Sequence, residues 1–109
     1  MKYLMFVATD AEPDASAEKL GDIEKWLSET GEQRIIGDRL RPAANAKTVR
    51  VRGGKVLVTD GPFAEAKEVI VGFDILECAS IEDAIAIAAK HPMARAGRLE
   101  LRPFWPLGE

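Results

Sequence analysis

Cysteine is almost absent from this chain, since Cys78 is the only one among 109 residues. A single thiol cannot form an internal disulfide, which fits a protein of the reducing cytoplasm. Histidine is equally rare, with His91 alone, so the paired ligand spacing of a structural zinc site is missing. A glycine-rich loop of the kind that holds phosphates is missing as well. We therefore expect a cytoplasmic protein with no metal and no other cofactor.

Long hydrophobic runs and an excess of positive charge are missing too. The run at Tyr3–Ala8 is too short to cross a bilayer, and the acids that follow it (Asp10, Glu12 and Asp14) do not fit a secretory signal. Fifteen basic residues against eighteen acidic ones give a net charge of −3 and an isoelectric point near 5.2. A nucleic-acid-binding domain normally carries a basic surface. We expect neither a membrane nor a nucleic acid as a partner.

The chain has the composition of one ordinary globular domain spanning residues 1–109, with 47% hydrophobic and 30% charged residues. Its charges are unevenly distributed. Residues 10–32 carry eight acids against two lysines, whereas residues 34–55 carry seven bases against one aspartate. These blocks are either two solvated faces, or the basic block attracts an anionic ligand or the acidic helix of a neighbouring subunit.

Two segments, residues 2–9 and 69–76, are apolar on both faces and predict central strands of a sheet. Between them, residues 16–30 predict a helix that ends at Gly31 and has an apolar stripe of Leu20, Ile23 and Leu27. Residues 33–40 predict a short strand. Residues 48–52 and 55–59 predict a hairpin, because Gly53-Gly54 suits the positive φ angles of a two-residue turn.

After the second central strand, Ser80 begins a further helix, with Asp83 at the spacing of a capping box. Its predicted apolar stripe is Ile81, Ala84, Ile85 and Ala88. Residues 98–105 alternate and predict a last strand at an edge of the sheet. The order β-α-β, hairpin, β-α-β predicts an α+β ferredoxin-like sandwich with helices on one sheet face. Because the central strands are apolar on both faces, we expect a homodimer that covers the other face.

Several segments carry a family resemblance: TVRVR at residues 48–52, VTDGPFAEAKE at 58–68, and the stretches 1–5, 91–95 and 100–103. With these the chain resembles the DGPF group of YCII-related proteins. The resemblance implies a ferredoxin-like fold assembled as a dimeric α/β barrel. It also implies an enzyme-like cleft with a histidine and an aspartate, although residues 16–30, where the wider family often has its histidine, contain none here. Some relatives are linked to sigma factors of the extracytoplasmic-function type, which implies a transcription-related alternative.

Two residues are candidates for acid/base chemistry. Asp60 precedes Gly61-Pro62 at a sharp exit from a strand, so it either stabilises the turn or serves as a base or ligand acceptor in the cleft. His91 ends the second predicted helix, where it is either a structural cap or surface histidine, or a proton donor or acceptor. If the two share a cleft, the carboxylate and the helix terminus should raise the pKa of His91 above about 6.5.

Three further residues are candidate ligand contacts. Arg50 and Lys67 together offer positive charge to an anion, or lie on a solvated face. Asp74 interrupts an apolar strand, so its carboxylate should be paired or face a cleft. We therefore predict a protein that binds a small polar or anionic molecule in a cleft, with acid/base catalysis as an open question. The alternative is a non-catalytic regulatory or protein-interaction module.

Overall fold

The computed structural model describes residues 1–16, 23–62 and 68–108 and contains the predicted elements in the predicted order. The elements are β1 (Lys2–Thr9), α1 (Ile23–Glu29), β2 (Arg34–Arg39), the short 3-10 helix η2 (Ala43–Asn45), β3 (Lys47–Arg52), β4 (Lys55–Asp60), β5 (Ile70–Glu77), α2 (Ile81–Ala89), α3 (Met93–Ala96) and β6 (Gly97–Pro103). The alternation of strands and helices expected of an α+β sandwich is confirmed.

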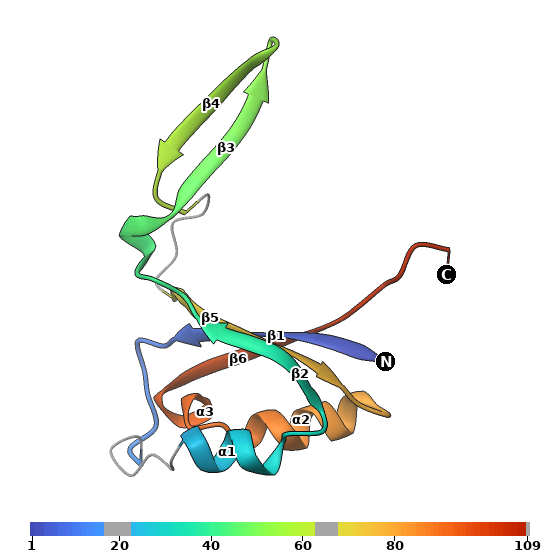
Figure 1. Cartoon of the computed structure of the whole chain (residues 1–109). Coiled ribbons are helices and arrows are strands. Elements are labelled where there is room, and N and C mark those ends of the chain that lie inside the picture. Colours follow the sequence, from blue (N-terminus) through green and yellow to red (C-terminus); the bar gives the residue numbers. More distant parts are fainter. Residues whose placement is uncertain (17–22, 63–67, 109) are drawn as a thin grey trace.

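The main sheet is antiparallel and has the strand order β2-β5-β1-β6. The two strands that are apolar on both faces, β1 and β5, are the central ones, as predicted. The helices α1, α2 and α3 cover the same face of this sheet (Figure 1). The order and the one-sided helix layer are those of a ferredoxin-like fold.

The core lies between the sheet and the helices. Tyr3, Met5 and Val7 of β1 alternate toward the helices, and Leu76 of β5 joins them. From α1 it is Trp26 that is fully buried, whereas Ile23 is 43% exposed. The predicted helix stripe was therefore wrong at Ile23, and Leu20 lies outside the described residues.

The stripe of α2 needs a similar correction. Ala84 and Ala88 are buried as predicted, but Ile85 is 53% exposed and Ile87 packs against the core instead. The indole Nε1 of Trp26 donates to the Ile87 carbonyl oxygen at 2.9 Å, which links α1 to this turn of α2. The start of α2 follows the prediction, since the Ser80 side chain accepts a hydrogen bond from the Asp83 backbone N–H at 3.2 Å.

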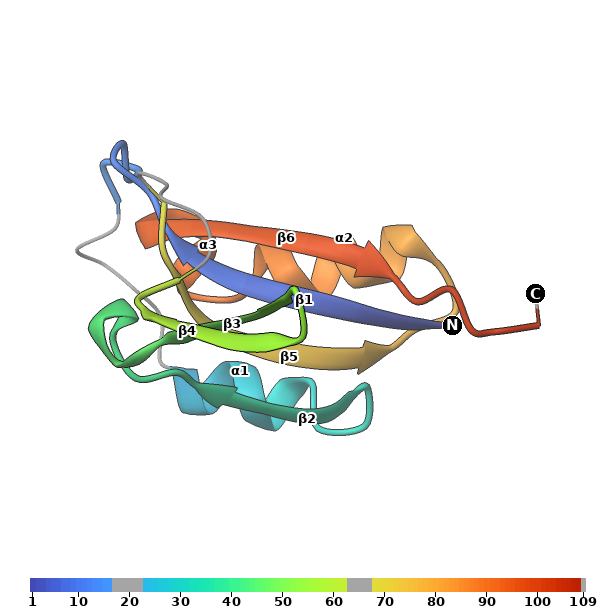
Figure 2. The same ribbon diagram turned by 90° about the horizontal axis from the view of Figure 1, so that it is seen from above.

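The hairpin β3–β4 forms a separate two-stranded sheet. It projects from the body on the side away from the helices, as Figures 1 and 2 show together. Its turn is the predicted one, with φ of +58° at Gly53 and +75° at Gly54. We call residues 47–60 the arm.

The face of the main sheet opposite the helices has no cover among the described residues. Leu4 and Phe6 of β1 and Phe73 and Ile75 of β5 pair across this face, since Phe6 is the register partner of Phe73 and Leu4 of Ile75. We call this surface the open sheet face. Within the described part of the chain, no helix is long and apolar enough to span a membrane.

Candidate functional site

A cleft of about 720 Å³ opens between the β2–β5 edge of the sheet, α1 and the turn that joins α2 to α3. Its walls are mostly apolar and include Trp26, Leu27, Val71 and Met93. Five polar or charged residues also line it: Arg34, Asp38, Arg39, Asp74 and His91. A mostly apolar hollow with a few convergent polar groups is the usual form of a small-molecule site.

Asp74 provides the buried carboxylate of the cleft. The register of the sheet sets Asp74 beside Gly37 of β2, and a side chain at Gly37 would overlap with this carboxylate, because an added Cβ would lie 2.0 Å from its Oδ1. Glycine at this position therefore leaves room for the acid. Asp74 is only 6% exposed, and its charge is paired, as the sequence predicted.

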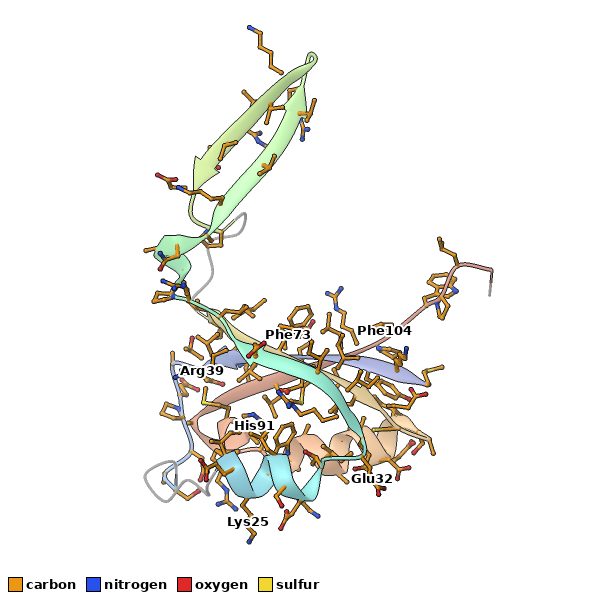
Figure 3. The ribbon with its side chains drawn as sticks, in the orientation of Figure 1. Lys25, Glu32, Arg39, Phe73, His91 and Phe104 are labelled. Atoms are coloured by element: carbon orange, nitrogen blue, oxygen red, sulfur yellow. The ribbon has the colours of Figure 1, made fainter. Side chains whose placement is uncertain are left out.

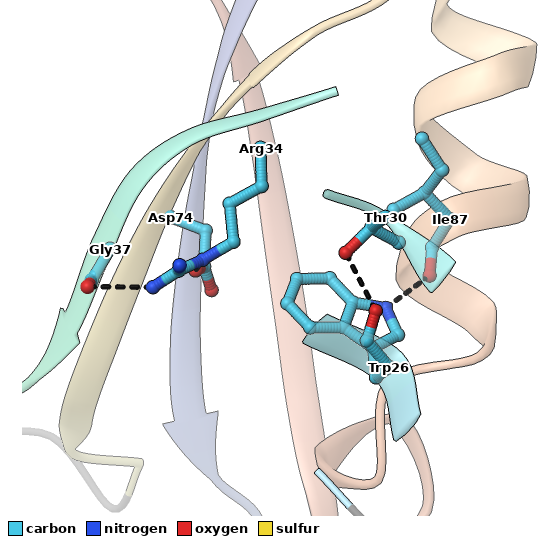
Figure 4. Close-up of polar contacts among 6 residues, drawn as sticks. All are labelled: Trp26, Thr30, Arg34, Gly37, Asp74 and Ile87. Atoms are coloured by element: carbon cyan, nitrogen blue, oxygen red, sulfur yellow. Dashed lines mark hydrogen bonds and ion pairs between the residues drawn. The ribbon is translucent and has the colours of Figure 1, made fainter. Parts of the chain in front are cut away.

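The partner of Asp74 is Arg34, the first residue of β2. Its Nε donates to Asp74 Oδ1 at 2.6 Å, and its Nη2 donates to the Gly37 carbonyl oxygen at 2.7 Å (Figure 4). The guanidinium is thus fixed between a carboxylate and a backbone carbonyl. Two such bonds hold the planar group in one orientation against the cleft wall.

Burial raises the pKa of Asp74 above the ordinary value of 3.8. The hydrogen bond and charge of Arg34 oppose this rise, and the neighbouring Asp38 carboxylate adds to it. Desolvation outweighs the ion pair, so the pKa moves toward the range in which a carboxylate accepts protons effectively.

His91 is 7% exposed and lies between the sheet and the helices, while Phe73 is on the opposite side of the sheet (Figure 3). Its Nδ1 accepts a hydrogen bond from the Met93 backbone N–H at 2.9 Å, so the neutral ring carries its proton on Nε2. Burial lowers its pKa from 6.5 to about 4. The rise predicted on the condition that Asp60 shares the cleft is not found, because Asp60 lies on the arm and burial disfavours the charged form of the ring.

The Trp26 ring forms the floor against which His91 packs. Their centroids are 4.6 Å apart with an interplanar angle of 66°, an edge-to-face arrangement. The Trp26 carbonyl oxygen accepts a hydrogen bond from Thr30 Oγ1 at 2.7 Å, and the indole is anchored to α2 through Ile87 (Figure 4). The bond from Nε1 fixes the indole, the bond to the carbonyl oxygen holds the end of α1, and the indole packs against the imidazole.

The other predicted site residues lie elsewhere. Asp60, the last residue of β4, is on the arm, where its exposed carboxylate forms an ion pair with Lys47. Arg50 is exposed on β3, and Lys67 is outside the described residues. Neither Asp60 nor Arg50 is among the described residues that line the cleft. The structure therefore brings Asp74 and His91 into one cleft but does not bring Asp60 to His91.

Sequence reasoning missed Trp26 as a site residue, and it included Arg34 only within the basic block of residues 34–55, not as the partner of Asp74. The signal for Arg34 was present, since an acid inside an apolar strand requires a nearby cation and Arg34 starts the neighbouring strand. Among the described residues, no group of three or more potential ligands is arranged to hold a metal ion. Cys78 is buried, and burial raises the pKa of its thiol, which disfavours the reactive thiolate.

Comparison with known proteins finds a similar sequence, a similar solved structure and a matching family model. A curated protein of Rhizobium meliloti (strain 1021), itself uncharacterised, is 42% identical over 87 residues, which cover 78% of this chain and 69% of that protein. A similar solved structure is 5-chloro-2-hydroxyhydroquinone dehydrochlorinase (TftG) from Burkholderia phenoliruptrix AC1100, in complex with 2,5-dihydroxybenzoquinone. It has a TM-score of 0.52 at 13% identity and covers 96% of this chain and 94% of its own, so it shares the fold. The family model for the YCII-related domain matches residues 1–107, and the chain therefore belongs to the YCII-related family.

Proposed function

We propose that the cleft binds a small molecule that has an apolar, ring-sized body and polar or anionic substituents. The observation that carries this proposal is the presence of a buried Asp74 paired with a half-buried Arg34, and of a neutral His91, on the walls of one cleft of about 720 Å³. The apolar walls suit the body of the ligand, and the guanidinium suits an anionic oxygen on its edge.

We propose different roles for the two proton-carrying groups. Asp74 is the base, because its raised pKa makes the carboxylate a better proton acceptor than an ordinary aspartate. His91 is a hydrogen-bond donor through Nε2–H, since its Nδ1 is already occupied and its lowered pKa keeps the ring neutral. Arg34 positions the carboxylate of Asp74 and holds its charge in the cleft.

The fold neighbour supports the choice of ligand class. It is named a dehydrochlorinase of a chlorinated hydroxyhydroquinone, and its complex holds 2,5-dihydroxybenzoquinone. Such a molecule combines a flat six-membered ring with ionisable oxygens, which is the combination that the cleft walls suit. We use 2,5-dihydroxybenzoquinone as the probe for this reason.

Tryptophan fluorescence tests the proposal, because Trp26 lies in the cleft wall. In a Trp105→Phe background, which leaves Trp26 as the single tryptophan, titration with 2,5-dihydroxybenzoquinone should quench the emission with a saturable curve. Arg34→Gln should weaken the apparent affinity at least tenfold, since it removes the positive charge that suits the anionic oxygen and leaves the Asp74 carboxylate unpaired in the cleft. Arg50→Gln, on the arm, is the matched control and should change the apparent affinity less than twofold. A linear quenching curve, or equal effects of the two substitutions, would rule out the assigned cleft.

We also propose that the chain forms a homodimer through the open sheet face, closing an α/β barrel. Leu4, Phe6, Phe73 and Ile75 give this face an apolar centre, and an uncovered apolar sheet surface is unusual in a monomer. Membership of the DGPF group within the family is supported by the run at residues 60–63. A cytoplasmic location is supported by the single cysteine of the chain.

A further inference from the structure

The arm has two faces of opposite character. In its register, Val49 pairs with Val58 and Val51 with Val56, so these four side chains share one face, which we call the valine face. The opposite face carries Thr48, Arg50, Arg52, Lys55, Leu57 and Thr59. The arm is therefore amphipathic, although its apolar face is not packed against the described part of the same chain.

The valine face is exposed to solvent in the single chain. Val49 is 62% exposed, Val51 56%, Val56 67% and Val58 57%. A lone two-stranded hairpin is marginally stable in water, and a hairpin with one apolar face normally packs that face against another surface. The alternation of valines with charged residues on β3 is thus typical of a strand that is half-buried in the assembled protein.

The position of the arm indicates what covers it. The arm rises on the same side of the main sheet as the open sheet face (Figure 1). The chain end after β6 extends on this side as well, with Trp105 84% exposed and Phe104 37% exposed. Strands of six residues give the arm a length of about 20 Å, whereas two packed sheets lie about 10 Å apart. An arm of that length extends past any sheet that packs on the open sheet face.

The size of the valine face excludes it as a complete interface. Its two strands cover roughly 20 by 10 Å, whereas a stable interface buries about 800 Å² on each partner. The arm therefore needs an occupant that also covers the neighbouring open sheet face. A second copy of this chain meets that need by symmetry, because a two-fold axis presents each copy's apolar sheet to the other.

We propose that the valine face of each arm packs against the partner subunit, so that two arms clasp a sheet-to-sheet homodimer. This inference depends on the proposed dimer but adds a second contact to it. The basic face of the arm, with Arg50 and Arg52, then remains in solvent.

The test compares two aspartates introduced at neighbouring residues of β4. Val58→Asp charges the valine face, and Thr59→Asp places the same charge on the opposite face of the same strand. Sedimentation equilibrium of the full chain gives the dimer dissociation constant of each variant. We expect Val58→Asp to raise this constant at least tenfold and Thr59→Asp to change it less than threefold.

A second measurement does not depend on substitutions. Hydrogen exchange of the wild-type chain, followed by mass spectrometry over a dilution series, should show residues 47–60 losing protection at the same concentration as β1 and β5. If both variants dimerise like the wild type, or weaken the dimer equally, the valine face is not the contact, and the sheet-to-sheet dimer stands without it. If the wild-type chain is a monomer at 100 μM, both the proposed arm contact and the proposed dimer are wrong. The valine face then binds another protein.

Discussion

At the scale of single residues, the two buried ionisable groups of the cleft respond to burial in opposite directions. Burial disfavours the charged form of each, so it raises the pKa of Asp74 and lowers that of His91. These opposite shifts are the basis of the separate roles that we propose for the two groups, Asp74 as base and His91 as a neutral hydrogen-bond donor. Arg34 limits the shift of the acid and leaves the imidazole unaffected.

The lowered pKa of His91 predicts acid sensitivity of the fold. As the pH falls, the unfolded chain binds the imidazole proton first, near pH 6.5, whereas the folded chain resists protonation down to about pH 4. The stability linked to this group is therefore complete above pH 6.5 and is lost as the pH falls from there to 4. The variant His91→Asn retains an acceptor for the Met93 N–H but has no imidazole to protonate. Relative to this variant, we expect the free energy of unfolding of the wild type to fall by about 3 kcal/mol over this interval.

Urea denaturation at pH 7.5, 6 and 4.5 measures this difference, and an NMR titration of the single imidazole gives the pKa directly. The wild type and His91→Asn should have parallel curves above pH 7 and diverge below it. An imidazole pKa at or above 6.5 would contradict the buried environment described here.

At the scale of secondary-structure elements, the sequence predicted existence and order well and helix faces less well. Alternation, the Gly53-Gly54 turn and the Ser80 cap are local signals, and each element that depends on them is confirmed. Which side of α1 faces the core depends on the packing of Trp26 against α2, a contact between residues 61 positions apart. Hydrophobic periodicity alone does not show whether one large ring or several smaller aliphatic side chains will face the core.

The junction between the arm and the body depends on the backbone of Gly61. Its φ is +93°, a conformation that other residues rarely adopt, and its amide donates to the Ala46 carbonyl oxygen at 2.8 Å. Gly61→Ala should therefore destabilise the protein by about 1 kcal/mol through backbone strain, since nothing within 4 Å would meet the added methyl group. Gly31→Ala is the control, because Gly31 has no positive φ and its nearest neighbour would lie at an ordinary 3.7 Å.

Denaturant midpoints of both variants decide this prediction. The midpoint of Gly61→Ala should fall, whereas that of Gly31→Ala should stay unchanged or rise slightly. Equal midpoints in the two variants would remove the strain argument for Gly61.

At the scale of the whole molecule, the sequence indicated the uncovered sheet face but not the geometry of the cleft. Two central strands apolar on both sides are visible in the sequence, and they predict one covered and one open sheet face. The cleft arises where β2, β5 and the α2–α3 turn meet, and the register that sets Gly37 beside Asp74 depends on long-range strand pairing. For that reason Asp74 was a candidate from the sequence, while Arg34 was not predicted as its partner.

The proposed dimer predicts that thermal stability depends on protein concentration. Association stabilises the folded state by mass action, so the melting temperature of the wild type should rise as the concentration is raised from 1 to 100 μM. Phe6→Asp places a charge at the centre of the open sheet face and should abolish this rise, because a desolvated unpaired carboxylate is costly. Ile85→Asp is the matched control, since it places the same charge on α2, on the helix side of the molecule, at a residue that is already 53% exposed. Differential scanning calorimetry over the concentration series measures the effect, and a melting temperature independent of concentration in the wild type would show that the open sheet face does not hold two copies together.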